Sequence, residues 1–134
     1  MAAMKQQQPR LDCAVDAAMS VTEGRWKTVI ICKLAHANQP LRYNQLMNGI
    51  QGISPRIFTL QLKEMERDGI LTRTVLSEAP KCVEYELSDR GRSLIPILIQ
   101  LAAWGVNNMF PNRVAFDSSI KLPDSRELQS GEIY

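Results

Sequence analysis

The sequence predicts a mostly α-helical protein that carries one small β-hairpin, and three observations support this prediction. Apolar residues recur at helical spacing in several segments of the chain. Two short segments near the middle, residues 71–76 and 83–87, alternate instead in the manner of strands. The chain has 134 residues, of which 45% are hydrophobic. It is therefore long enough to form one hydrophobic core without disulfide bonds.

Three helices are expected in the first half of the chain, because apolar residues fall on one helical face in three separate segments. The segments are residues 13–21, 26–37 and 43–50. The sequence Asn-Gln-Pro at residues 38–40 indicates a turn between the second and the third helix. Gly49 and Gly52 then bracket a tight connection to the next element.

The clearest helix start in the sequence is at Ser54. Its hydroxyl can accept a hydrogen bond from a free backbone N–H, and Pro55 suits the first helical position, where no N–H is needed. The helix is expected to run to Asp68 and to end at Gly69, which favours a left-handed C-terminal cap. Its buried stripe is expected to consist of Phe58, Leu62 and Met65, with Ile57 beside them.

A hairpin and a last helix complete the expected fold. Residues 77–81 are expected to form the hairpin loop, and Ser88 to cap a long helix that reaches about Met109. Pro96 should kink or divide that helix. We expect a flexible N-terminus at residues 1–12, a folded domain at residues 13–110, and an extension at residues 111–134 that is either flexible or packed on a partner.

The order of the elements predicts the fold. Two short helices joined by a tight turn and followed by a hairpin are typical of the winged helix-turn-helix. The first two helices and the last helix are additional to that arrangement. The sequence therefore predicts a winged helix-turn-helix with extra helices at both ends.

The helix that begins at Ser54 has a face suited to reading DNA, and Ser54 itself is a candidate DNA contact. This face, opposite the apolar stripe, consists of Arg56, Thr59, Leu60, Lys63 and Arg67. Arginine can bind guanine edges in the major groove, and threonine can contact a base or a phosphate. Basic side chains on a helix are often merely solvated. The helix cap, the preceding short helix and the following hairpin together favour DNA binding instead.

Three further basic residues are candidates for contacts with DNA phosphates. Arg42 precedes the short helix and Lys27 lies near the start of the second helix, where phosphate contacts would position the protein without specifying a sequence. Lys81 lies at the tip of the hairpin, the wing, although Glu78 beside it weakens the argument. The net charge of +2 is too small to argue for nucleic acid by itself.

Short segments between Cys13 and about Met109 resemble the HxlR-type regulators, relatives of the MarR group. The segments are Cys13, Glu23-Gly24-Arg25-Trp26-Lys27, Leu41-Arg42-Tyr43-Asn44-Gln45-Leu46, Gly52-Ile53-Ser54, the run from Leu62 to Leu71, the run from Val83 to Gly91, and Trp104. Each is weak alone, but their order is specific. The resemblance implies a transcriptional regulator, more often a repressor, that binds double-stranded DNA. It also implies a homodimer built from the first and last helices, with two recognition helices in successive major grooves of a pseudo-palindromic operator.

The chain departs from the family pattern at two positions. Leu60 stands where the family usually has a polar residue, so it either contacts a thymine methyl group or weakens readout there. Cys82 stands where a basic residue is common, and the wing is then expected to hold phosphate less firmly.

Cys13 matches an N-terminal cysteine that senses oxidants or electrophiles in some members of the family. A thiolate near a helix N-terminus is stabilised and reacts faster, which agrees with that role, and Cys82 could trap the oxidised thiol as a disulfide. The alternative is a buried structural thiol. Cys32 lies in an apolar helix and is expected in the core. Three widely spaced cysteines do not indicate a disulfide framework.

No pattern in the sequence points to an enzyme. His36 is the only histidine, and zinc-ligand spacing, phosphate-binding glycine loops and nucleophile elbows are missing from the sequence, so neither a metal nor a cofactor is expected. No apolar run is long enough to span a membrane and no secretory signal is present, so we expect a cytoplasmic protein. Trp26 and Trp104 are expected to anchor helix packing at the dimer interface.

The sequence leaves one alternative function and one further partner open. Winged helices also serve as protein-interaction modules without specific DNA binding, and such a module would not need the basic face formed by Arg56, Lys63 and Arg67. A small-molecule effector could bind between the dimer helices and the DNA-binding core.

Overall fold

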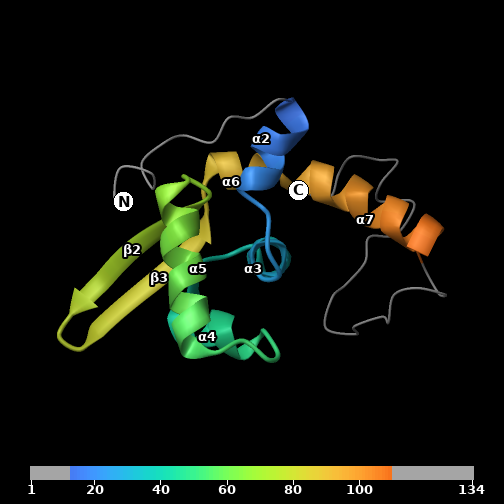
Figure 1. Ribbon diagram of the computed structural model, residues 1–134. Coiled ribbons are helices and arrows are strands. Elements are labelled where there is room, and N and C mark those ends of the chain that lie inside the picture. Colours follow the sequence, from blue (N-terminus) through green and yellow to red (C-terminus); the bar gives the residue numbers. More distant parts are fainter. Residues whose placement is uncertain (1–12, 110–134) are drawn as a thin grey trace, which may run out of the picture.

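The computed structural model describes residues 13–109, and within this range it has the predicted order of elements plus one short strand (Figure 1). The elements are α2 (Ala14–Ser20), α3 (Lys27–Ala37), β1 (Leu41–Arg42), α4 (Tyr43–Asn48), α5 (Pro55–Arg67), β2 (Leu71–Glu78), β3 (Lys81–Leu87), α6 (Asp89–Ser93) and α7 (Ile95–Met109). The mostly helical, winged helix-turn-helix fold is thus confirmed. The segments expected at residues 1–12 and 111–134 lie outside the described residues.

The hydrophobic core forms around one face of α5. Phe58, Leu62 and Met65 are buried, as predicted, and they belong to one cluster with Ile30 of α3. The ring of Phe58 also packs edge-on against the ring of Tyr43, with 5.0 Å between the ring centroids. Each buried side chain of this size contributes about 1.5–3 kcal/mol. This packing determines which side of α5 faces solvent.

Ile57 does not belong to the buried stripe, and that part of the prediction is wrong. Its side chain is 36% exposed, whereas the neighbouring Phe58 is fully buried. One residue along an α-helix corresponds to a rotation of about 100°. Ile57 therefore lies at the edge of the exposed face of α5.

The three strands form an antiparallel sheet in the order β1-β3-β2. β1, which the sequence did not predict, pairs Leu41 with Tyr85 and so joins the start of α4 to the wing. β2 ends at Glu78 and β3 begins at Lys81. These two residues are paired, so only residues 79 and 80 connect the strands. The expected loop at residues 77–81 is therefore mostly strand.

The last helix is divided just before Pro96, as the proline predicts. Ser88 caps α6, because its Oγ accepts a hydrogen bond from the backbone N–H of Gly91 at 3.0 Å. Figure 1 shows α7 extending away from the other helices and the sheet. Across residues 13–109, no helix is long and apolar enough to cross a membrane.

Gly91 allows α6 to approach the backbone that follows α5, and this contact generates a prediction. A Cβ atom at Gly91 would lie 2.3 Å from the carbonyl oxygen of Ile70. Gly91→Ala is therefore expected to lower the free energy of unfolding by about 2–3 kcal/mol, because backbone must shift. Gly105→Ala is the matched control, since no atom of residues 13–109 lies within 4 Å of its Cβ position. Equal urea midpoints for the two variants would contradict the close packing.

Candidate nucleic-acid interface

The N-terminus of α5 is fixed by the cap that the sequence predicted. Ser54 has extended backbone, and its Oγ accepts a hydrogen bond from the backbone N–H of Ile57 at 3.2 Å. Pro55 follows as the first helical residue. In helix-turn-helix proteins the first turns of the recognition helix contact base edges. The cap therefore orders the part of α5 on which the candidate site depends.

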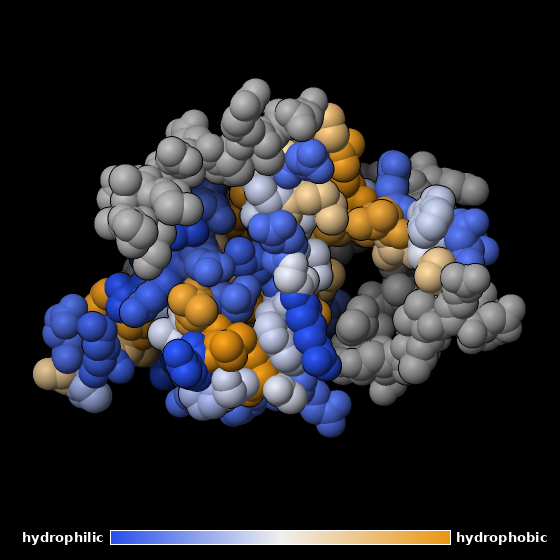
Figure 2. Space-filling view, viewed as in Figure 1, coloured by the Kyte–Doolittle hydropathy of each residue, from blue (hydrophilic) through white to orange (hydrophobic). Residues whose placement is uncertain are grey.

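The face of α5 that points away from the core is exposed and mostly basic. Arg56, Lys63 and Arg67 are exposed, and Leu60 lies among them with 48% of its surface accessible. Nε of Arg67 is 3.7 Å from Oδ1 of Asp68, so the charge of Arg67 is partly balanced. Figure 2 shows hydrophobic side chains interrupting the otherwise hydrophilic surface over α5. Free positive charge is therefore greatest in the first part of this face.

Thr59 was expected on the DNA-reading face, but the structure places its hydroxyl against α4. Oγ1 of Thr59 lies 2.9 Å from the hydroxyl oxygen of Tyr43, and Tyr43 also donates to the carbonyl oxygen of Pro55 at 3.4 Å. Thr59 is half-buried by this contact. The two hydroxyls tie α4 to the first two turns of α5. Sequence reasoning missed Tyr43, whose partner is 16 residues away.

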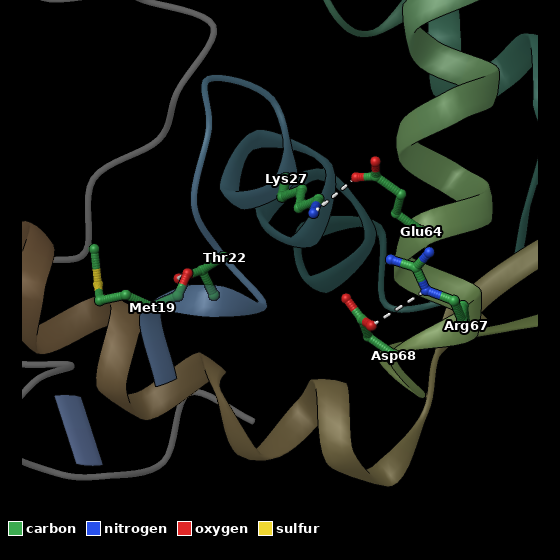
Figure 3. A network of polar contacts seen from close by, with 6 residues as sticks. All are labelled: Met19, Thr22, Lys27, Glu64, Arg67 and Asp68. Atoms are coloured by element: carbon green, nitrogen blue, oxygen red, sulfur yellow. Dashed lines mark hydrogen bonds and ion pairs between the residues drawn. The ribbon is translucent and has the colours of Figure 1, made fainter. Parts of the chain in front are cut away.

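Lys27 is not an exposed phosphate contact, and this correction follows from its burial. Only 6% of Lys27 is accessible, and its Nζ lies 2.9 Å from Oε2 of Glu64 in α5. Figure 3 shows the side chains of Lys27 and Glu64 pointing toward each other between α3 and α5. A buried ammonium group needs such a partner, because an unpaired charge away from water is costly. Lys27 therefore anchors α5 to α3.

Arg42 and Lys81 remain exposed at the two positions where phosphate contacts were expected. Arg42 caps α4, and its backbone N–H donates to Oε1 of Gln45 at 2.9 Å, which leaves the guanidinium free of the cap. Lys81 begins β3 opposite Glu78 at the tip of the wing. Both side chains are candidates for positioning contacts, with Lys81 flanked by a carboxylate.

The three cysteines occupy different environments. Cys13 is exposed and directly precedes α2, so it is not a buried structural thiol in this chain, and Cys82 is half-buried in β3. Cys32 is also exposed, contrary to the expectation that it lies in the core. Neighbouring atoms still desolvate its thiol and raise its pKa, although the nearby Lys33 opposes that shift. Cys32 therefore forms less thiolate at neutral pH than an ordinary cysteine.

The two tryptophans are placed differently. Trp26 is half-buried and packs against the core of its own chain, with the guanidinium of Arg25 4.7 Å from its ring centroid. Trp104 is 59% exposed on α7, in line with the exposed Ile97 and Leu101. The spacing of these three α7 residues places them on one helical face. We call this set the α7 stripe.

The described arrangement defines a class of protein: a winged helix-turn-helix with a capped, cationic recognition helix. Within residues 13–109, no three His, Cys, Asp or Glu side chains gather in a way that would hold a metal ion. The chain matches the HxlR-like helix-turn-helix family over residues 21–113 and belongs to that family. The family consists of transcriptional regulators and not of enzymes.

Similar proteins agree in both sequence and structure. YtcD, an uncharacterized HTH-type transcriptional regulator of Bacillus subtilis (strain 168), is 40% identical over 116 residues, which cover 87% of this chain and 89% of YtcD. The redox regulator HypR in its oxidized form is 36% identical, with a TM-score of 0.63 over 72% of this chain and 97% of HypR. The reduced form of the B. subtilis transcriptional regulator YodB is 30% identical, with a TM-score of 0.65 over 76% of this chain and 99% of YodB.

The ion pair between Lys27 and Glu64 generates a prediction about stability. Lys27→Met is expected to lower the free energy of unfolding by about 2–3 kcal/mol, because it leaves the carboxylate of Glu64, whose side chain is 29% exposed, without its partner. The double variant Lys27→Met with Glu64→Leu is expected to regain most of that loss. Urea unfolding at one protein concentration measures both effects.

Lys63→Met serves as the control, because Lys63 is exposed on the same helix as Glu64. Its effect is expected to stay within about 0.5 kcal/mol. A double variant no more stable than Lys27→Met alone would show that the charges are not coupled.

Proposed function

We propose that this regulator binds a pseudo-palindromic operator as a homodimer and that it represses transcription rather than activating it. The observation that carries the proposal is the exposed face of α5, on which Arg56 and Lys63 stand opposite a fully buried apolar stripe. Two copies of such a helix, related by a two-fold axis, suit half-sites one helical turn apart. Arg56 reads a base edge in the major groove, while Arg42 and Lys81 contact phosphates.

The α7 stripe supports the homodimer. Ile97, Leu101 and Trp104 are each more than half exposed, and with Pro96 and Gln100 they line an open groove. Val15 and Met19 of α2 are exposed as well. Apolar helix faces of this kind are typical of protein–protein contacts. Covering them with a second copy would use the same helices in both subunits, as two-fold symmetry requires.

Regulation by oxidation of Cys13 is the finer part of the proposal. Cys13 is exposed beside α2, one of the two helices that we assign to the dimer interface. A peroxide converts a thiolate to a sulfenic acid and is itself reduced to water, and a second thiol can then displace hydroxide to form a disulfide. A bond of this kind next to the dimer helices would change the distance between the two recognition helices. HypR, at 36% identity, is described as a redox regulator.

The DNA-binding proposal predicts the effect of removing one side chain. Arg56→Ala is expected to weaken binding to the operator by about 1–3 kcal/mol, because a bidentate base contact is lost. The measurement is a mobility shift with the intergenic DNA that flanks the gene, titrated with salt. Arg92→Ala, which removes an equal charge from α6, is expected to leave specific binding almost unchanged. Equal losses in the two variants, on operator and random DNA alike, would favour an interaction module.

The redox proposal predicts a different result for each cysteine. Hydrogen peroxide is expected to release the wild-type protein from its operator, and Cys13→Ser should abolish this release while DNA binding under reducing conditions is retained. Cys32→Ser is the control, because desolvation of Cys32 raises its pKa and reduces its thiolate. A Cys13→Ser protein that still leaves DNA on oxidation would rule out Cys13 as the sensor.

A further inference from the structure

Leu60 is a large apolar side chain on the exposed face of α5, and it does not belong to the hydrophobic core cluster. It is 48% exposed, although the core beneath it is already filled by buried residues of the same helix. Figure 2 shows hydrophobic side chains at the surface over this helix. Water contact at an apolar side chain is unfavourable, so covering Leu60 would stabilise a complex.

The neighbours of Leu60 indicate the chemistry of what covers it. Arg56 lies one turn before Leu60 and Lys63 one turn after it, and both cations are exposed. The next carboxylate on this side, Glu64, is drawn toward α3 by its ion pair with Lys27 (Figure 3). An occupant must therefore be apolar at one point and anionic around it. The major groove fits this description wherever a thymine methyl group lies between phosphates.

The lack of hydrogen-bonding groups in the side chain of Leu60 restricts which part of a base pair it can contact. Leu60 has no polar atom in its side chain, and the hydroxyl of the adjacent Thr59 is directed to Tyr43 at 2.9 Å. The only apolar feature that a base pair presents in the major groove is the 5-methyl group of thymine. Leu60 also lies in the second turn of α5, within the half that enters the groove in this class of protein.

We propose that Leu60 is a specificity-determining residue that packs against the 5-methyl group of a thymine in each operator half-site. The proposal rests on the DNA-binding function proposed above and specifies one base that the protein recognises in each half-site. A polar residue at this position would select a different base. A cytosine that carries a 5-methyl group offers the same apolar contact, so 5-methylcytosine partly replaces the thymine at this position.

The test is a cycle that deletes the methyl group and the leucine separately and together. Each thymine of the footprinted half-site is replaced in turn by uracil, and binding is measured by fluorescence anisotropy for wild-type and Leu60→Ala proteins. One replacement is expected to weaken wild-type binding about fourfold per half-site, the value for one buried methyl group. The same replacement should change binding by Leu60→Ala less than twofold. Ile57→Ala is the matched control, because Ile57 is 36% exposed on the same helix, and it should keep the full methyl effect.

The outcomes separate this proposal from the DNA-binding function. Specific operator binding that no uracil replacement weakens, or a methyl effect that persists in Leu60→Ala, overturns the role of Leu60 and leaves the regulator intact. A methyl effect that disappears in Ile57→Ala but not in Leu60→Ala would assign the contact to Ile57, and this too overturns the role of Leu60. Wild-type binding no tighter to the flanking DNA than to random DNA overturns the proposed function itself. Leu60→Ala should unfold at the wild-type urea concentration, because its side chain lies outside the core.

Discussion

Burial of one face of α5 is the constraint on which the rest of the structure depends. Phe58, Leu62 and Met65 must reach the core together, and a rigid helix that buries them has a single rotation available about its axis. That rotation places Arg56 and Lys63 in solvent on the opposite side. The proposed DNA-binding face is thus a geometric consequence of core packing, and no separate interaction is needed to expose it.

Two polar contacts add precision to this apolar docking. The Lys27–Glu64 ion pair joins α5 to α3, and the contact between the hydroxyls of Tyr43 and Thr59 joins it to α4. Both pairs are at least partly shielded from water, where a missing partner costs more than a present one contributes. They therefore disfavour small rotations and translations of α5 that apolar packing alone would tolerate. The ion pair also keeps a carboxylate away from the cationic face.

The exposed apolar side chains of α2 and α7 lie apart from the candidate DNA-binding face. Ile97, Leu101 and Trp104 line one side of α7, which extends away from the core (Figure 1), while the wing and α5 remain at the other side of the chain. This separation would let two copies join through α7 without covering either recognition helix. Cys13 precedes α2, whose Val15 and Met19 are exposed as well. In the proposed dimer, oxidation of Cys13 would act on the spacing of the two α5 helices and leave their side chains unchanged.

The sequence by itself determined the features that arise within one or two helical turns. The Ser54 cap, the buried stripe of α5 and the division before Pro96 all follow from neighbours close along the chain, so periodicity and capping rules predicted them. The tertiary structure alone decided what distant residues do to one another. The sequence alone favours a phosphate contact for Lys27, whereas the folded chain pairs it with Glu64. The two-residue strand β1 exists only because β3 lies beside it. Local patterns carry no information about such partners, since the free energy of a buried charge or an edge strand depends on what packs against it.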